Sequence, residues 1–189
     1  MMAGYSNIRL MPLACFSLWL TLVIVLPVQA RAEGGRELRS QYATVLYDSP
    51  ELLQEFNENL QLGRQLGYVL QMRKAITRED ELRAKLDIVI NKAQEVLDMR
   101  PQNLRFFIKL FPDEKGVREE YKRNYHQEVN YLAYYSLSRK TMYLSVNRVS
   151  LRVFAHEVGH VIVDHFFPVR PPYKIHELMA QYVETHITD

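Results

Sequence analysis

The chain has 189 residues, of which 48% are hydrophobic and 24% are charged. This length and composition predict a globular protein with one domain large enough for its own core, and they exclude a disordered chain. The 24 basic and 22 acidic residues nearly balance, which argues against a nucleic-acid partner because such a partner needs a strongly basic face.

Residues 1–32 carry the pattern of a secretory signal peptide. An arginine precedes an apolar run over residues 10–28, and two small-x-small triplets end at Ala30 and Ala32, where cleavage is expected. The prolines in the run and the triplets favour cleavage. The length of the run is near the lower limit for a bilayer span, which leaves an uncleaved membrane anchor open. We expect an exported protein, periplasmic or secreted, whose mature domain covers residues 33–189.

Cleavage would produce a formally neutral domain without cysteine. Arg9 and Arg31 leave with the segment and no acidic residue does, so 22 basic residues balance 22 acidic ones. The one cysteine, Cys15, lies inside the apolar run. Disulfides and cysteine zinc ligands are therefore excluded, and a metal site must use histidine, glutamate or aspartate.

The first half of the domain is predicted to form one strand and two helices. Residues 42–47 alternate and are rich in β-forming side chains, which predicts a strand. Residues 48–62 begin with a capping residue and a proline suited to the first helical turn. Residues 63–77 stay unassigned because glycines interrupt the helical pattern. Apolar side chains in residues 78–99 follow a period of 3.6, which predicts a second helix.

The second half mixes strands and helices. Residues 103–112 are predicted to form a strand that a proline ends, and residues 130–146 a β-hairpin. Residues 113–125 between them are an exposed helix or a loop. Ser150 can cap a helix that runs to about Phe167. A proline-rich loop over 168–174 and a last helix over 175–187 complete the chain.

The helix after Ser150 contains the sequence HEVGH. His156 and His160 are four residues apart, so on a helix they project from one face and can bind one metal ion. Glu157 is rotated by about 100° from His156, which lets it reach a water on the metal without becoming a ligand. The apolar flanks would keep the site partly dry. The pattern alone leaves coincidence open.

A catalytic zinc takes three protein ligands and keeps one open position. A third histidine six residues after His160 is excluded, because position 166 is phenylalanine and His165 is out of step by one. Glu177 on the last predicted helix is the remaining choice. The loop before it extends to roughly 20 Å, which is enough to turn the chain back. We therefore predict a zinc site of His156, His160 and Glu177.

The sequence HEVGH followed by KIHELMAQYVE resembles the gluzincin zinc metallopeptidases, the peptidase MA-like group that includes the thermolysin-like enzymes. Glu177, Ala180, Tyr182 and Glu184 match the acidic ligand, small residue, tyrosine and glutamate of the second motif in that group. The resemblance implies an α+β, zincin-like fold, in which a small mixed sheet packs on helices and the HExxH helix precedes the third-ligand helix. It also implies Zn²⁺ as cofactor and Glu157 as general base.

The sequence departs from this family in three ways. Leu178 and Lys174 stand where many relatives have glycine and an aromatic residue, which concerns packing. Gln181 stands where thermolysin-like enzymes have an aspartate that orients a ligand histidine; it can accept the same hydrogen bond without a charge. Relatives also continue into a helical subdomain that supplies substrate pockets and a residue that steadies the transition state, whereas this sequence ends at Asp189.

Other side chains near the motif are candidates for the roles that this subdomain fills. Asp164 lies one turn beyond His160 and is a candidate for supporting a ligand. The candidates for steadying the transition state are Tyr173, Tyr182, His165 and His176.

Three functions are consistent with the sequence. The favoured one is an exported peptidase that hydrolyses a peptide or protein substrate through a zinc-bound water with Glu157 as general base. In that reading residues 130–137 are the sheet edge that pairs with the substrate. The second is a zinc-binding module of the same fold without catalysis, and the third is an unrelated exported protein with a chance motif. A partner protein that completes the cleft is a further expectation, and a membrane contact is expected only if the N-terminal segment stays uncleaved.

Overall fold

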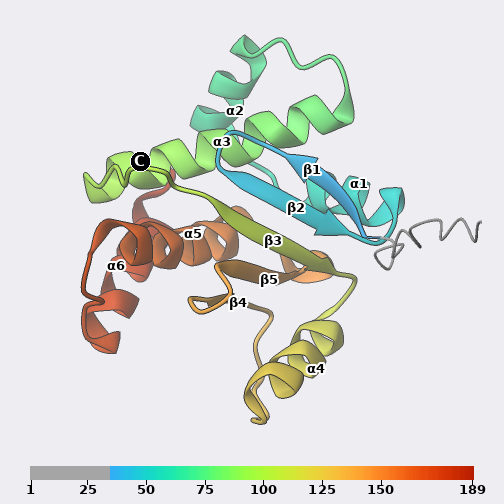
Figure 1. Ribbon diagram of the computed structural model, residues 1–189. Helices are drawn as coiled ribbons and strands as arrows, with labels where there is room; N and C mark the ends of the chain where they lie inside the picture. Colours follow the sequence, from blue (N-terminus) through green and yellow to red (C-terminus); the bar gives the residue numbers. More distant parts are fainter. Residues whose placement is uncertain (1–34) are drawn as a thin grey trace, which may run out of the picture. The chain divides into compact units, whose positions relative to one another are not determined.

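The computed structural model describes residues 35–189, and the segment predicted as a signal peptide or anchor lies outside them. Within the described residues, no helix combines the length and apolarity needed to cross a membrane. The fold is mixed α+β (Figure 1). The elements in chain order are β1 (Arg36–Arg39), β2 (Ala43–Tyr47), α1 (Pro50–Asn59), α2 (Gly63–Met72), α3 (Arg78–Leu97), β3 (Phe106–Phe111), α4 (Glu114–Tyr125), β4 (Ala133–Ser136), β5 (Thr141–Ser145), the 3₁₀ helix η1 (Val146–Arg148), α5 (Leu151–Phe166) and α6 (Tyr173–His186).

The five strands form one mixed sheet in the order β1-β2-β3-β5-β4. β2, β3 and β5 run parallel, whereas β1 and β4 pair antiparallel with their neighbours at the two edges. Short turns suffice for the antiparallel pairs, while the parallel pairs need long crossovers. The crossover from β2 to β3 contains α1, α2 and α3. As an edge strand, β4 has one side without a strand partner.

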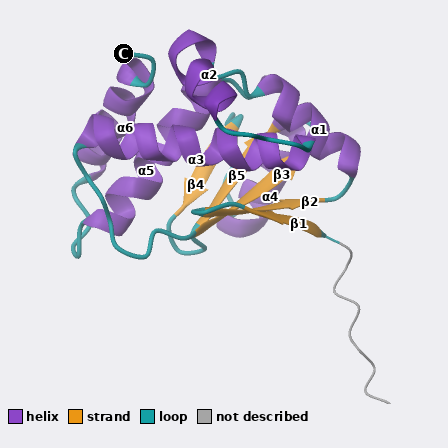
Figure 2. Cartoon of the chain, turned by 90° about the horizontal axis from the view of Figure 1, so that it is seen from above, coloured by secondary structure: helices purple, strands orange, loops and turns teal. Residues whose placement is uncertain are grey.

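Alternate side chains of β3, β4 and β5 belong to two separate cores. Ile108, Met142 and Leu144 belong to the main core, which also contains buried side chains of α1, α3 and α5. Tyr134 and Tyr143 point to the opposite face, where Val117 of α4 packs on them. Figure 2 shows α1, α3, α5 and α6 gathered on one side of the strands. Because side chains alternate along these three strands, helices cover both faces of this part of the sheet.

Helices α5 and α6 pack closely, and this contact positions the candidate site. Ser150 caps α5 by accepting a hydrogen bond from the backbone N–H of Val153. Phe154 and Ile162 of α5 are fully buried in the main core, so the opposite face of the helix is left for α6 and the cavity. Gly159 faces Ala180 across the helix pair, and a β-carbon at Gly159 would lie only 2.8 Å from the α-carbon of Ala180.

The predicted α+β class is confirmed, as are the strands near 42–47 and 103–112, the hairpin and the main helices. Two elements differ. The unassigned segment after residue 62 contains α2, whose helix tolerates Gly67, and the charged strand β1 lies before the first predicted strand. Helix α6 begins at Tyr173, two residues before the predicted start.

Candidate metal centre

Three side chains predicted as metal ligands meet at one point between α5 and α6. The Nε2 atoms of His156 and His160 are 3.2 Å apart. The carboxylate of Glu177 lies 3.6 Å from Nε2 of His156 and 3.4 Å from Nε2 of His160. Among the described residues, these three form the only group of histidine, aspartate and glutamate side chains arranged to hold a metal ion.

The spacing of these atoms fits zinc. Ligand atoms about 2.0–2.1 Å from a tetrahedral zinc lie about 3.3–3.4 Å from one another. The separation of the two Nε2 atoms is close to this value, and each Nε2 atom is near it from one oxygen of Glu177, Oε2 for His156 and Oε1 for His160. Two imidazoles and one carboxylate are also a donor set that zinc accepts, with one coordination position left open.

Each ligand histidine turns its other ring nitrogen toward a hydrogen-bond partner. Nδ1 of His156 is 3.0 Å from Oε2 of Glu184, and Nδ1 of His160 is 2.7 Å from Nδ1 of His176. A carboxylate can only accept, so His156 donates from Nδ1 and its Nε2 has a free lone pair. If His160 likewise donates to His176, the Nε2 lone pairs of both ligands face Glu177 with no proton between them. Metal-binding histidines have this pattern.

His160 is held neutral, as a ligand must be. Burial lowers the pKa of His160 to about 3, and the charges of His156, His176 and Arg170 act in the same direction. Burial also lowers the pKa of His176, whose Nε2 is buried without a hydrogen-bond partner. A protonated imidazole has no lone pair for a metal, so these shifts keep His160 available over the neutral pH range.

Glu157 lies beside the three ligands without joining them. Its side chain is buried, and Oε2 has no hydrogen-bond partner. Burial and, second, the charge of Glu177 raise the pKa of Glu157 to about 8, while the backbone N–H of Tyr135 acts against them. A buried carboxyl with an unpartnered oxygen and a raised pKa is a candidate acid–base group, because its charged form is costly to bury without a partner.

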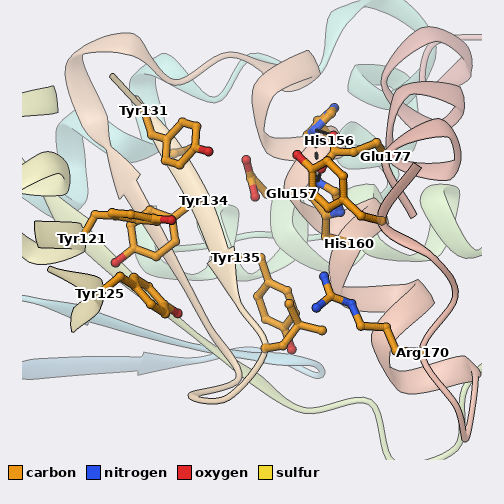
Figure 3. A pocket seen from close by; sticks show the side chains of 13 residues that line it. Tyr121, Tyr125, Tyr131, Tyr134, Tyr135, His156, Glu157, His160, Arg170 and Glu177 are labelled. Carbon is orange, nitrogen blue, oxygen red and sulfur yellow. Dashed lines mark hydrogen bonds and ion pairs between the residues drawn. The ribbon is translucent and has the colours of Figure 1, made fainter. Parts of the chain in front are cut away.

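A cavity of about 380 Å³ opens in front of Glu157 and the three ligands (Figure 3). The β4 strand and α4 form its opposite wall, and Arg170 from the loop before α6 lies at its margin. Tyrosine side chains form much of the surface of this cavity. The tyrosines that line the cavity are Tyr121, Tyr125, Tyr131, Tyr134, Tyr135 and Tyr173.

The structure places two of the remaining sequence candidates, His176 and Tyr173, at the site and the others away from the metal centre. His176 contacts His160. Tyr173 lines the cavity beside Glu177, and its hydrogen bond to the carboxylate of Glu177 raises the pKa of the Tyr173 phenol. Asp164 does not contact His160; it accepts a hydrogen bond from the hydroxyl of Tyr135. His165 contacts backbone carbonyls of Val161 and Arg105 instead of the cavity.

Two candidates on α6 point elsewhere. Gln181 is exposed and its side chain makes no hydrogen bond to a ligand histidine within the described part of the chain, so the orienting role predicted for it falls to Glu184. Tyr182 is half exposed and stacks on His186, with ring centroids 4.1 Å apart.

The sequence reasoning matched Glu184 to the family motif without assigning it a role, and it did not name Arg170. Glu184 follows Glu177 by seven residues, almost two helical turns, so both lie on one face of α6 and the spacing alone could have identified it. Arg170 lies in a loop, where no periodicity predicts the direction of a side chain. The tyrosines from α4 and β4 join the site only through tertiary packing.

Comparison with protein-family models, with curated proteins and with solved structures gives no match. The case for the site is therefore its own geometry.

Proposed function

We propose that the protein is an exported, zinc-dependent peptidase with a zincin-like fold, in which residues 1–32 act as a signal peptide. One observation carries the proposal: His156, His160 and Glu177 bring three potential ligand atoms within 4.8 Å of one another, and the buried carboxyl of Glu157, with its unpartnered Oε2, lies beside them. Peptide hydrolysis needs this combination of a metal and a separate acid–base group.

Zinc, when bound by His156, His160 and Glu177, supplies a Lewis acid that polarises both water and a substrate carbonyl. The protein's part is proton transfer. In its ionised form, which the positive charge of a bound zinc would favour, Glu157 takes a proton from the attacking water on its free Oε2 and delivers it to the nitrogen of the leaving amine. Glu184 and His176 hold the ligand rings in place during this exchange.

Strand β4 is suited to hold an extended substrate. Among the described strands it lies at the edge of the sheet, so its outward backbone groups, apart from the Tyr135 N–H that faces Glu157, can pair with another chain. Tyr135 and Ala133 of β4 line the same cavity as Glu157, so a peptide paired with β4 would pass the acid–base group. The tyrosine wall would then contact its side chains.

The Glu157→Gln variant tests the catalytic claim. It removes the acid–base group and preserves the ligands, so it should retain zinc and lose peptide hydrolysis by about 10²–10⁴-fold. Glu119→Gln, an exposed acid on α4, is the matched control and should hydrolyse like the parent protein. Full activity in Glu157→Gln would contradict the mechanism. A zinc-loaded parent that cleaves no peptide would instead favour the non-catalytic zinc-binding module.

A further inference from the structure

Arg170 brings a positive charge to the cavity in front of the metal centre. Among the residues that the structure describes, it is the only lysine or arginine lining this cavity, and it lies in the loop between α5 and α6. In Figure 3 its guanidinium points toward Tyr135 and His160.

The acidic groups around Arg170 are engaged with other partners. Glu177 contacts the two ligand histidines, Glu184 contacts His156, and Asp164 accepts a hydrogen bond from Tyr135. Within residues 35–189, no carboxylate lies within 4.0 Å of the guanidinium. Its charge is therefore available to a ligand that enters the cavity.

The loop that carries Arg170 has little conformational freedom. Pro168 precedes it, and Pro171 and Pro172 follow directly. Arg170 directly precedes Pro171 and is therefore restricted to extended conformations, while Pro171 and Pro172 have fixed φ angles of their own. A guanidinium on a stiff backbone loses less entropy when it binds than one on a mobile loop.

We propose that Arg170 binds a carboxylate of the substrate. The carboxylate is either the C-terminus of a short peptide or an aspartate or glutamate side chain next to the cleaved bond. The planar guanidinium pairs with a carboxylate through two parallel hydrogen bonds. An extended chain advances at most about 3.6 Å per residue, so a carboxylate one or two residues from the cleaved bond lies roughly 4–7 Å from it. This inference rests on the proposed peptidase function and adds its substrate class.

A binding experiment tests the proposal without relying on turnover. The zinc-loaded Glu157→Gln protein is incubated with libraries of acetylated tetrapeptides made as matched free acids and amides, each with glutamate or glutamine at every position. Mass spectrometry measures which peptides the protein retains. The same measurement is made in the Glu157→Gln background with Arg170→Ala and, as control, with Arg152→Ala, which removes an exposed arginine of α5 outside the cavity.

The parent background should retain free acids over amides if the C-terminal carboxylate is bound, or glutamate over glutamine peptides if a side chain is bound. Arg170→Ala should lower that preference by about tenfold or more, since a hydrogen-bonded charge pair is lost. Arg152→Ala should preserve it. Absence of any carboxylate preference, or a preference that survives Arg170→Ala, would overturn the proposal. Hydrolysis of the same libraries by the zinc-loaded protein with Glu157 intact reports separately on the peptidase function.

Discussion

The carboxyl of Glu157 couples the stability of the metal-free protein to pH. Its folded-state pKa is about 8 against an ordinary 4.5, so the folded protein holds a proton that the unfolded chain releases. The contribution of Glu157 to the free energy of unfolding is therefore fully present below about pH 4.5 and is lost as the pH rises through 8. His160 has a lowered pKa of about 3, so its contribution is lost only as the pH falls below 6.5. Between pH 6.5 and pH 8, the pH dependence of stability from Glu157 is therefore not offset by that from His160.

We therefore expect the free energy of unfolding of the metal-free protein to fall by about 2 kcal/mol between pH 6.5 and pH 8. Glu157→Gln removes the titrating group and should show little of this change. Urea unfolding in the presence of a chelator measures both. An equal loss in the two proteins would show that Glu157 is not held protonated in the metal-free fold.

Glu184 provides a test of how the ligand rings are held. Its carboxylate accepts a hydrogen bond from Nδ1 of His156, so Glu184→Ala should weaken zinc affinity by about 10–100-fold. Gln181→Ala on the same helix removes an exposed side chain and should have no effect. Competition with a zinc-binding dye gives both affinities. A larger loss of zinc affinity in Gln181→Ala than in Glu184→Ala would favour the orienting role that the sequence predicted for Gln181.

At the scale of elements, the contact between α5 and α6 decides whether Glu177 reaches the histidines. A β-carbon at Gly159 would lie 2.8 Å from the backbone of Ala180, so Gly159→Ala should push the helices apart. We expect a destabilisation of about 1–3 kcal/mol together with weaker zinc binding. Gly67→Ala on α2, where no atom lies within 4 Å of the new carbon, is the matched control and should bind zinc normally. Thermal unfolding with and without zinc separates the two effects, and normal zinc binding in Gly159→Ala would refute this role of the helix contact.

Elements with a strong local pattern were predictable from the sequence, and the others depend on packing. Helix α3 has a Thr77 capping box and a regular apolar stripe, and α5 has the Ser150 cap. Strand β1 consists mostly of exposed charged residues, with Leu38 as its one buried side chain, so its pairing with β2 determines its structure. Helix α2 contains glycine and buries only Leu66. The four residues of β1 are too few for a periodic signal, whereas α2 is amphipathic and its two glycines obscured the helical pattern.

At the scale of the whole molecule, the sheet and the helices bring distant segments to one cavity. The spacing of His156, Glu157 and His160 follows from the helical period, and Glu177 required only a loop that turns back, so these four were accessible from the sequence. The tyrosine wall requires α4 on one face of the sheet and α5 on the other, with β4 at the edge between them. Such a neighbourhood comes from topology, which local periodicity does not encode.

The most direct test of the metal centre is the zinc content of the purified protein beside its Glu177→Ala variant. After incubation with zinc and removal of the excess, elemental analysis should find about one zinc per chain in the parent, consistent with a single three-ligand site. The variant should retain clearly less, because one ligand is lost. A parent protein without zinc, or a variant that retains it equally well, would contradict the assignment of His156, His160 and Glu177 as a zinc site.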